Sequence, residues 1–163
     1  MALRIIVVAH IADGQVNIYL NQNHRGELHM QVLVWEDRFS VGIRQFDQHH
    51  KILFEMINSL IFAQEDKSDP NVIKNTMEQL RSYTLFHFVA EEAMMKHFGF
   101  DGLDEHIEEH EALLAHVISY QERIANNDGV TLEEVLEFLA SWLMDHTLGL
   151  DQLYGPFLSR YSD

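Results

Sequence analysis

The sequence predicts an all-α protein, an up-down-up-down antiparallel four-helix bundle preceded by a short N-terminal extension of uncertain structure. Three observations predict this fold. The 163 residues include only 2 Pro and 8 Gly, so residues that break helices are scarce. From Arg44 onward, apolar residues recur at three- and four-residue steps through four long segments. Short polar connections join these segments, which makes consecutive helices antiparallel neighbours.

The first helical segment begins near Arg44 and ends in the polar stretch EDKSDP. Asp69 and Pro70 then predict the start of a second helix, because Asp is a favoured N-cap and proline is tolerated in the first turn. We expect that helix to run to about Lys96. The stripe of the first helix that should face the bundle interior comprises Phe46, His50, Leu53, Phe54, Ile57 and Ile61.

The third and fourth helical segments follow the break HFGFDG. The third should run from about Leu103 to Ala125, where NNDG closes it. Thr131 with Glu134 three residues later forms a capping-box pattern that predicts the start of the fourth helix. This last helix is expected to reach about Gly149.

Residues 1–34 have a different pattern and are expected to be an N-terminal extension, with the bundle domain spanning 35–163. The β-branched runs RIIVVAHI and VNIYL are separated by the turn signal ADGQ, which favours a hairpin. The polar stretch NQNHRGELHMQ is typical of a linker. A small appendage, a leader and a segment that never folds all remain open for this region.

The composition excludes several classes of function. The chain has 11 basic and 26 acidic residues, a net charge of −15, which argues against binding nucleic acid or an anionic membrane. Cysteine is absent, which excludes disulfides, iron–sulfur clusters and thiolate zinc sites. No apolar run reaches membrane-spanning length, and the N-terminal apolar run is short for a signal peptide. A cytoplasmic location is therefore expected.

The distribution of the 11 histidines predicts a metal site. His87 and Glu91 are four residues apart, as are His106 and His110, and this spacing places both members of a pair on one helix face. Buried imidazoles and carboxylates need partners, and a cation supplies one to both kinds of group. Each of the four helices carries such residues on its predicted inner stripe. The full candidate set is His50, His87, Glu91, His106, His110, His146 and Asp151.

The stretch HTLGLD places Asp151 five residues after His146, which is the wrong spacing for one helix face. Five residues turn an α-helix through about 500°, so a regular helix would point the two side chains in different directions. If both belong to one site, the helix must tighten, bulge or end between them. Gly149 is the residue that would allow this change.

The candidate ligands favour two metal ions over one. Five imidazoles and two carboxylates are too many for a single tetrahedral zinc ion, whereas two near-octahedral ions bridged by carboxylates would use them all. Nitrogen and oxygen ligands without thiolate fit iron, although ligand type alone does not exclude manganese or zinc.

The stretches WEDRFSVGIRQFDQHHKILFEMINSL, HFVAEE, HIEEH and WLMDHTLGLD, in this order, resemble the bacterial branch of the hemerythrin family. The resemblance covers about residues 35–155. It implies a non-haem di-iron centre in which His106, His110 and His146 bind one iron and His50 and His87 bind the other. Glu91 and Asp151 would bridge the ions together with a solvent-derived oxo or hydroxo group.

The same resemblance implies reversible dioxygen binding at the open position of the two-histidine iron, for oxygen storage, delivery or sensing. Such a protein is an oxygen carrier and not an enzyme, with at most a weak peroxidase-like side activity. It would be a monomer or a homo-oligomer. The apolar wall that keeps water from the bound oxygen would be formed by residues next to the ligands, namely Phe88, Trp142 and Leu143, and Thr147 would also line the oxygen pocket.

Two positions depart from the family pattern. His49 stands where the family usually has Gln, so the ligand in the first helix is assigned to His50 by alignment with HKILF, and a contribution from His49 stays open. Thr147 stands where the family commonly has Ile. Its hydroxyl would make the pocket more polar and shorten the life of the oxygenated form.

Three other functions are compatible with parts of this pattern. A ferritin-like di-iron oxidase needs Glu three residues before His on two helices, and no His in this chain has that neighbour. HIEEH also matches the H-x-x-E-H pattern of inverted zinc proteases, but this match leaves the other histidines unexplained. The third alternative keeps the site and makes it an oxygen or redox sensor that signals to a partner protein.

Overall fold

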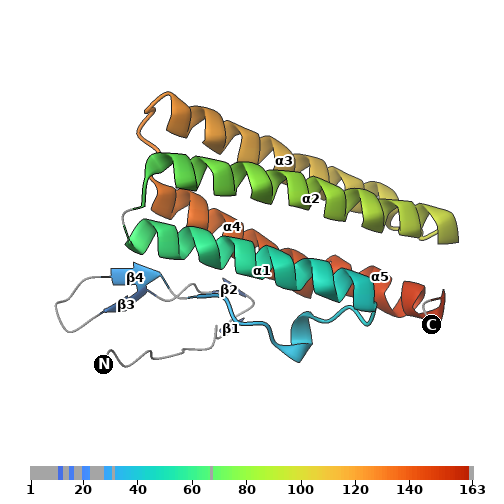
Figure 1. Cartoon of the computed structure of the whole chain (residues 1–163). Coiled ribbons are helices and arrows are strands. Elements are labelled where there is room, and N and C mark those ends of the chain that lie inside the picture. Colours follow the sequence, from blue (N-terminus) through green and yellow to red (C-terminus); the bar gives the residue numbers. More distant parts are fainter. Residues whose placement is uncertain are drawn as a thin grey trace.

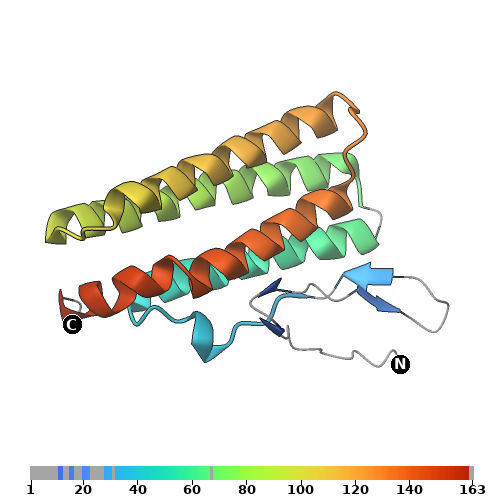
Figure 2. The same ribbon diagram turned by 180° about the vertical axis from the view of Figure 1, so that it is seen from behind.

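The computed structural model describes residues 11–12, 15–16, 20–22, 28–30, 32–66 and 68–161. In this part of the chain, helix α1 packs against α2 and α4, and α2 packs against α3 (Figure 1). The view from behind shows the same antiparallel arrangement (Figure 2). The predicted four-helix bundle is therefore confirmed. Its helices are α1 (Arg44–Glu65), α2 (Pro70–Phe98), α3 (Leu103–Ala125) and α4 (Leu132–Leu148).

The predicted helix starts are confirmed by their capping contacts. The Asp69 carboxylate accepts a hydrogen bond from the Asn71 backbone N–H at 2.8 Å, and Pro70 is the first residue of α2. At α4, the Thr131 side chain accepts from the Glu134 backbone N–H while the Glu134 carboxylate accepts from the Thr131 backbone N–H. These contacts satisfy N–H groups that have no partner within the helix. They therefore fix where α2 and α4 begin.

A fifth helix, α5 (Asp151–Leu158), follows α4 and was not predicted. It buries Tyr154, Gly155 and Leu158 against the segment that leads into α1. Gly155 lies so close to this segment that a Cβ at its position would be 2.5 Å from the Val41 carbonyl oxygen. This close approach holds α5 at the end of the bundle where the histidines gather.

Short paired strands precede the bundle. β1 (Ile11–Ala12) pairs antiparallel with β2 (Gln15–Val16), and β3 (Leu20–Gln22) pairs with β4 (Leu28–Met30). The prediction of a linker was wrong for β3 and β4, which pair in an antiparallel register that runs from Leu20 with Met30 to Gln22 with Leu28. Most of the predicted hairpin of RIIVVAHI and VNIYL lies outside the described residues.

Two clusters of buried side chains form the core. One runs through the bundle and includes Phe88 and Leu143, and the other lies at the α5 end and includes Phe46 and Tyr154. The candidate metal residues lie between these clusters, because Phe88 contacts His110 from one side and Tyr154 contacts His106 from the other. None of the described helices is both long and apolar enough to cross a membrane.

Candidate metal centre

The structure brings all seven candidate residues into one buried cluster. The side chain of every member is at most 5% exposed to solvent. α1 contributes one residue, α2 and α3 contribute two each, and α4 and α5 contribute one each. Two subsets have ligand atoms close enough to share an ion, and both of them contain the same glutamate. The subsets are Glu91, His106, His110 and His146, and His50, His87 and Glu91.

The two carboxylate oxygens of Glu91 face different groups of imidazoles. Oε1 lies 3.4 Å from His50 Nε2 and 3.5 Å from His87 Nε2. Oε2 lies 3.4 Å from His106 Nε2 and 3.5 Å from His110 Nε2. Glu91 therefore spans a two-histidine group and a second group built on α3, which is the geometry that a bridging carboxylate requires.

Asp151 repeats this arrangement from the opposite side. Its Oδ2 lies 3.2 Å from His50 Nε2, while its Oδ1 lies 3.0 Å from His146 Nε2 and 3.6 Å from His106 Nε2. Within the described part of the chain, neither Asp151 oxygen has a hydrogen bond of good geometry, although both are buried. A buried carboxylate that lacks hydrogen bonds of good geometry is costly, and a cation at this position would stabilise it.

The chain brings Asp151 beside His146 by interrupting the helix, as the spacing in HTLGLD predicts. α4 ends at Leu148, and Gly149 has φ −104° and ψ −92°, well outside helical values. α5 then begins at Asp151, which places the carboxylate at the first turn of a new helix. The negative charge is favourable there because it faces the positive end of the helix dipole.

Replacing Gly149 with alanine should disturb this interruption. An added Cβ would lie 2.8 Å from the Asp145 carbonyl oxygen, so the backbone must shift and carry Asp151 with it. We expect Gly149→Ala to lower the free energy of unfolding by about 2 kcal/mol and to reduce the metal content of the purified protein. Denaturant unfolding and metal analysis measure the two effects.

Gly129→Ala is the matched control for this variant. A Cβ at Gly129 meets no atom within 4 Å, so only the strain of its φ of 73° remains, about 1 kcal/mol. Metal content should be unchanged in this variant. Equal metal content in the two variants would contradict the role given to Gly149.

Without metal, the histidines of the cluster differ in their charge, because their pKa values are shifted in opposite directions. Burial lowers the pKa of His50, but its contacts with Asp151 and Glu91 outweigh burial and raise this pKa to about 10. Burial lowers the pKa of His87 to about 3. Burial and the charge of Glu91 raise the pKa of Asp151, but the contacts with His146 and His50 outweigh them and lower this pKa from 3.8 to about 2. At neutral pH the ionised Asp151 therefore faces a protonated His50, while His87, which lies beside Glu91, is neutral.

The donor set fits metal ions. The Nε2 atoms of His50 and His87 lie 3.1 Å apart, and those of His110 and His146 lie 3.2 Å apart. Neutral imidazoles coordinate through a lone pair, and two such pairs facing each other need a proton or a cation between or beside them. Nitrogen and oxygen donors without sulfur are typical of sites for iron, manganese or zinc.

Aromatic rings enclose the cluster on the α3–α4 side. The Phe88 ring stacks on His110 with ring centroids 3.5 Å apart, and Trp142 stacks on His146 with centroids 4.4 Å apart. Leu143 is 2% exposed and belongs to the same core. These contacts make a dry, apolar surrounding for the imidazoles, which is what the predicted wall requires.

Thr147 is fully buried, but its hydroxyl does not face the cluster as a free polar group. Oγ1 donates to the backbone carbonyls of Leu143 at 2.8 Å and Met144 at 3.2 Å. The hydroxyl proton is thus satisfied by the preceding turn of α4. The predicted increase in pocket polarity is correspondingly smaller than the residue type suggests.

His49 lies beside the cluster and outside it. His50 has no exposed surface and contacts both carboxylates, whereas His49 packs its ring against Phe86 and Tyr83. Burial and the neighbouring His50 lower the pKa of His49. The geometry favours His50 as the member from α1. His97 and His116, two histidines that are not part of the cluster, are exposed.

Two side chains near the cluster were missed by the sequence analysis. The Tyr154 hydroxyl donates a hydrogen bond to Glu91 Oε1, and burial, followed by the two carboxylate charges, raises its pKa well above the ordinary value. His110 Nδ1 donates to Glu92 Oε1 at 2.8 Å. The adjacent residues Glu91 and Glu92 therefore contact both ring nitrogens of one histidine, and Glu92 fixes which nitrogen carries the proton.

Removing the Glu92 carboxylate should loosen His110. In Glu92→Ala the buried Nδ1–H loses its acceptor, and we expect release of bound metal to a chelator to become about 10- to 100-fold faster. Glu92→Gln keeps an acceptor oxygen, so its rate of metal release should lie between those of the parent and Glu92→Ala. Glu108→Ala, an exposed position on α3, is the control. A release rate in Glu92→Ala equal to that of the control would contradict the positioning role.

Fold and site together define a class of protein: a four-helix bundle whose helices carry a buried histidine–carboxylate cluster that could hold metal ions. The sequence matches the family model of the hemerythrin HHE cation binding domain over residues 41–158. The chain belongs to the hemerythrin family. Hemerythrins are oxygen-binding proteins rather than enzymes, as the sequence analysis expected.

Individual relatives agree with this assignment. The chain is 35% identical over 125 residues to a bacteriohemerythrin of Pseudomonas aeruginosa, covering 77% of this chain and 80% of that protein. It is 31% identical to a bacteriohemerythrin of Stenotrophomonas maltophilia, with the same coverage, and 29% identical to a myohemerythrin of Theromyzon tessulatum, covering 74% of this chain and 88% of that protein. A crystal structure of wild-type hemerythrin superimposes with a TM-score of 0.72 at 26% identity, covering 78% of this chain and 98% of the other.

Proposed function

We propose that this protein binds dioxygen reversibly at a non-haem di-iron centre and thereby stores, delivers or senses oxygen. His106, His110 and His146 would hold one iron, and His50 and His87 the other. Glu91 and Asp151 would bridge the two ions, with an oxo or hydroxo group as the third bridge. The metal-binding unit would be residues 35–163, with residues 1–34 as an extension.

The observation that supports this proposal most strongly is the way the two carboxylates divide their oxygens. Glu91 directs Oε1 toward His50 and His87 and Oε2 toward His106 and His110. Asp151 directs Oδ2 toward His50 and Oδ1 toward His146 and His106. A single tetrahedral ion would not require carboxylates that divide their oxygens in this way, whereas two bridged ions would.

The unequal number of imidazoles supports binding of a small molecule. The ion that His50 and His87 would hold has fewer protein ligands than the ion that His106, His110 and His146 would hold, so it would have room for dioxygen. Two ferrous ions, when bound, supply the two electrons that reversible oxygenation needs. Phe88, Trp142 and Leu143 exclude water from the cluster, and Tyr154 holds Glu91 in its orientation.

Metal analysis and absorption spectroscopy test the proposal. The purified protein should contain about two iron atoms per chain and, after anaerobic reduction, gain a visible charge-transfer band on exposure to air. The band should disappear when oxygen is removed and return when oxygen is readmitted. One zinc ion per chain, or a band that does not reverse, would overturn the proposal.

A further inference from the structure

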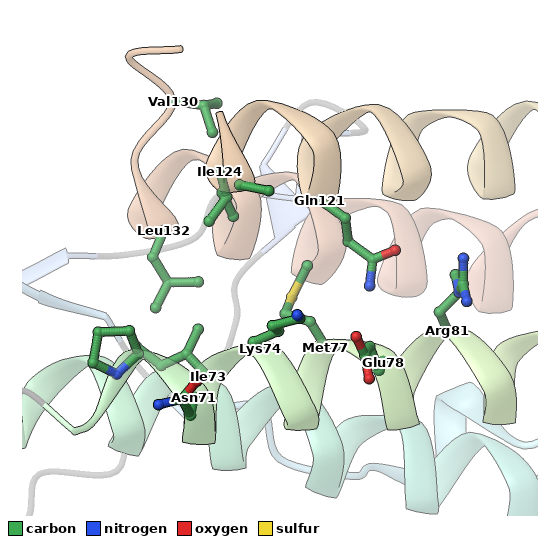
Figure 3. A pocket seen from close by; sticks show the side chains of 12 residues that line it. Asn71, Ile73, Lys74, Met77, Glu78, Arg81, Gln121, Ile124, Val130 and Leu132 are labelled. Atoms are coloured by element: carbon green, nitrogen blue, oxygen red, sulfur yellow. The ribbon is translucent and has the colours of Figure 1, made fainter. Parts of the chain in front are cut away.

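A second site lies at the opposite end of the bundle from the histidines. Figure 3 shows a pocket between the first half of α2, the last turns of α3 and the start of α4. We call it the end pocket. Its volume is about 440 Å³, which is within the range of small-molecule sites. Met77, on its floor, precedes His87 by ten residues on α2, or about 15 Å along the helix axis.

The end pocket lies beside the most loosely packed pair of neighbouring helices. α3 and α4 approach each other less closely than the other neighbouring pairs of the bundle. The Asn127 backbone has φ 54°, so the connection turns sharply before Val130 enters the pocket lining. The floor and walls are mainly apolar and are formed by Ile73, Met77, Ile124, Val130 and Leu132.

Charged side chains line one edge of this apolar surface. Figure 3 shows Lys74, Glu78 and Arg81 along α2, with Gln121 across from them on α3. In the part of the chain that the structure describes, none of the three charged groups has an ion-pair partner. The edge therefore carries two cations and one anion in a protein whose net charge is −15. The charged residues that line the end pocket are thus net positive, although the whole chain is net negative.

We propose that the end pocket binds a single-chain carboxylate amphiphile, such as a medium-chain fatty acid. The hydrocarbon chain would lie against the apolar floor, where burial is favourable and Met77 can adjust its shape. The carboxylate would lie at the α2 edge, within reach of the Arg81 guanidinium, which can bind it through two parallel hydrogen bonds. Lys74 adds a second positive charge. The proposal does not depend on the function of the metal centre.

Calorimetric titration of the purified, metal-containing protein with decanoate tests this proposal. We expect saturable binding of one decanoate per chain with a dissociation constant below about 1 mM. Decyltrimethylammonium has the same chain and the opposite charge, so it should bind at least about tenfold more weakly. Absence of saturable binding, or equal binding of the two probes, would overturn the proposal.

Substitutions along the edge test the position of the carboxylate. Arg81→Gln should weaken decanoate binding about tenfold, whereas Glu78→Gln should strengthen it severalfold because it removes a like charge. Lys96→Gln, an exposed position near the other end of α2, is the control and should bind as the parent does. Unchanged affinity in both edge variants would show that the carboxylate does not bind there.

A pocket-filling variant tests the place of the hydrocarbon chain. Val130→Trp should occupy the end pocket and abolish decanoate binding, while the melting temperature and metal content stay close to those of the parent. Ile73→Trp fills the pocket from α2 and serves as the second variant if the first is destabilised. Decanoate binding of parental strength in a folded pocket-filling variant would place the ligand elsewhere and contradict the proposal.

Discussion

The Asp151→Ala variant is expected to retain at most one iron atom per chain, where the parent should retain about two. Asp151 contacts imidazoles of both groups, with 3.2 Å from Oδ2 to His50 Nε2 and 3.0 Å from Oδ1 to His146 Nε2. Its removal would take one oxygen ligand from each ion and leave the facing imidazoles without a counter-charge. The affinity for iron should fall by at least about 100-fold. Metal analysis after dialysis against a weak chelator measures the loss.

Two variants provide matched controls for this experiment. Asp145→Ala removes an exposed aspartate from α4, and His116→Ala removes an exposed histidine whose ring contacts Phe138. Both should keep the parental iron content. If Asp151→Ala also kept two iron atoms, Asp151 would not be a ligand and the bridging arrangement would be wrong.

The metal-free protein should lose stability as the pH rises from 7 to 10. The pKa of His50 is raised from 6.5 to about 10, so the folded state holds a proton that the unfolded state releases near pH 6.5. The stabilisation from this proton is complete below pH 6.5 and is lost as the pH rises through 10. We expect the free energy of unfolding to fall by about 3 kcal/mol over this interval, because each pKa unit is worth about 1.4 kcal/mol. His146, whose pKa is raised in spite of burial by the charge of Asp151, adds to the same trend.

Urea unfolding of metal-free protein at several pH values measures this slope. In the metal-loaded protein an ion bound to His50 would take the place of this proton, so the slope between pH 7 and 10 should nearly disappear. The metal-free His50→Gln variant should also have a smaller slope, whatever its absolute stability. A metal-free protein with constant stability from pH 7 to 10 would contradict the charge state inferred for the cluster.

The bundle could be predicted from sequence because local signals and the overall fold agree. Apolar stripes at helical spacing run through all four segments, and Asp69 and Thr131 begin two of the helices with their own side chains. α5 gave no comparable signal, because its eight residues include Gly155 and Pro156, which disfavour helix. The close contact of Gly155 with Val41, which is distant in sequence, holds α5 against the entry to α1.

The candidate site was predictable to a similar extent and for a similar reason. Spacing identified the pairs on α2 and α3, because four residues return to one face of a helix. The spacing in HTLGLD required an interruption, and Gly149 provides it. Tyr154 and Glu92 were not predictable, because their roles depend on which neighbouring helix each side chain meets. No sequence pattern marks Tyr154 or Glu92, and only the packing of the helices places them against Glu91 and His110.

The position of Asp151 on α5 has a consequence for the order in which the protein is made. A chain leaves the ribosome from its N-terminus at about 5 to 20 residues per second, so the last member of the cluster emerges about 100 residues after the first. All five clustered histidines and Glu91 are available before Asp151 is. The nascent chain can thus form its four long helices while the metal cluster is still open on one side. A chain that stops before residue 151 would lack Asp151 and the α5 members of the second core cluster, so both the centre and that end of the core would be incomplete.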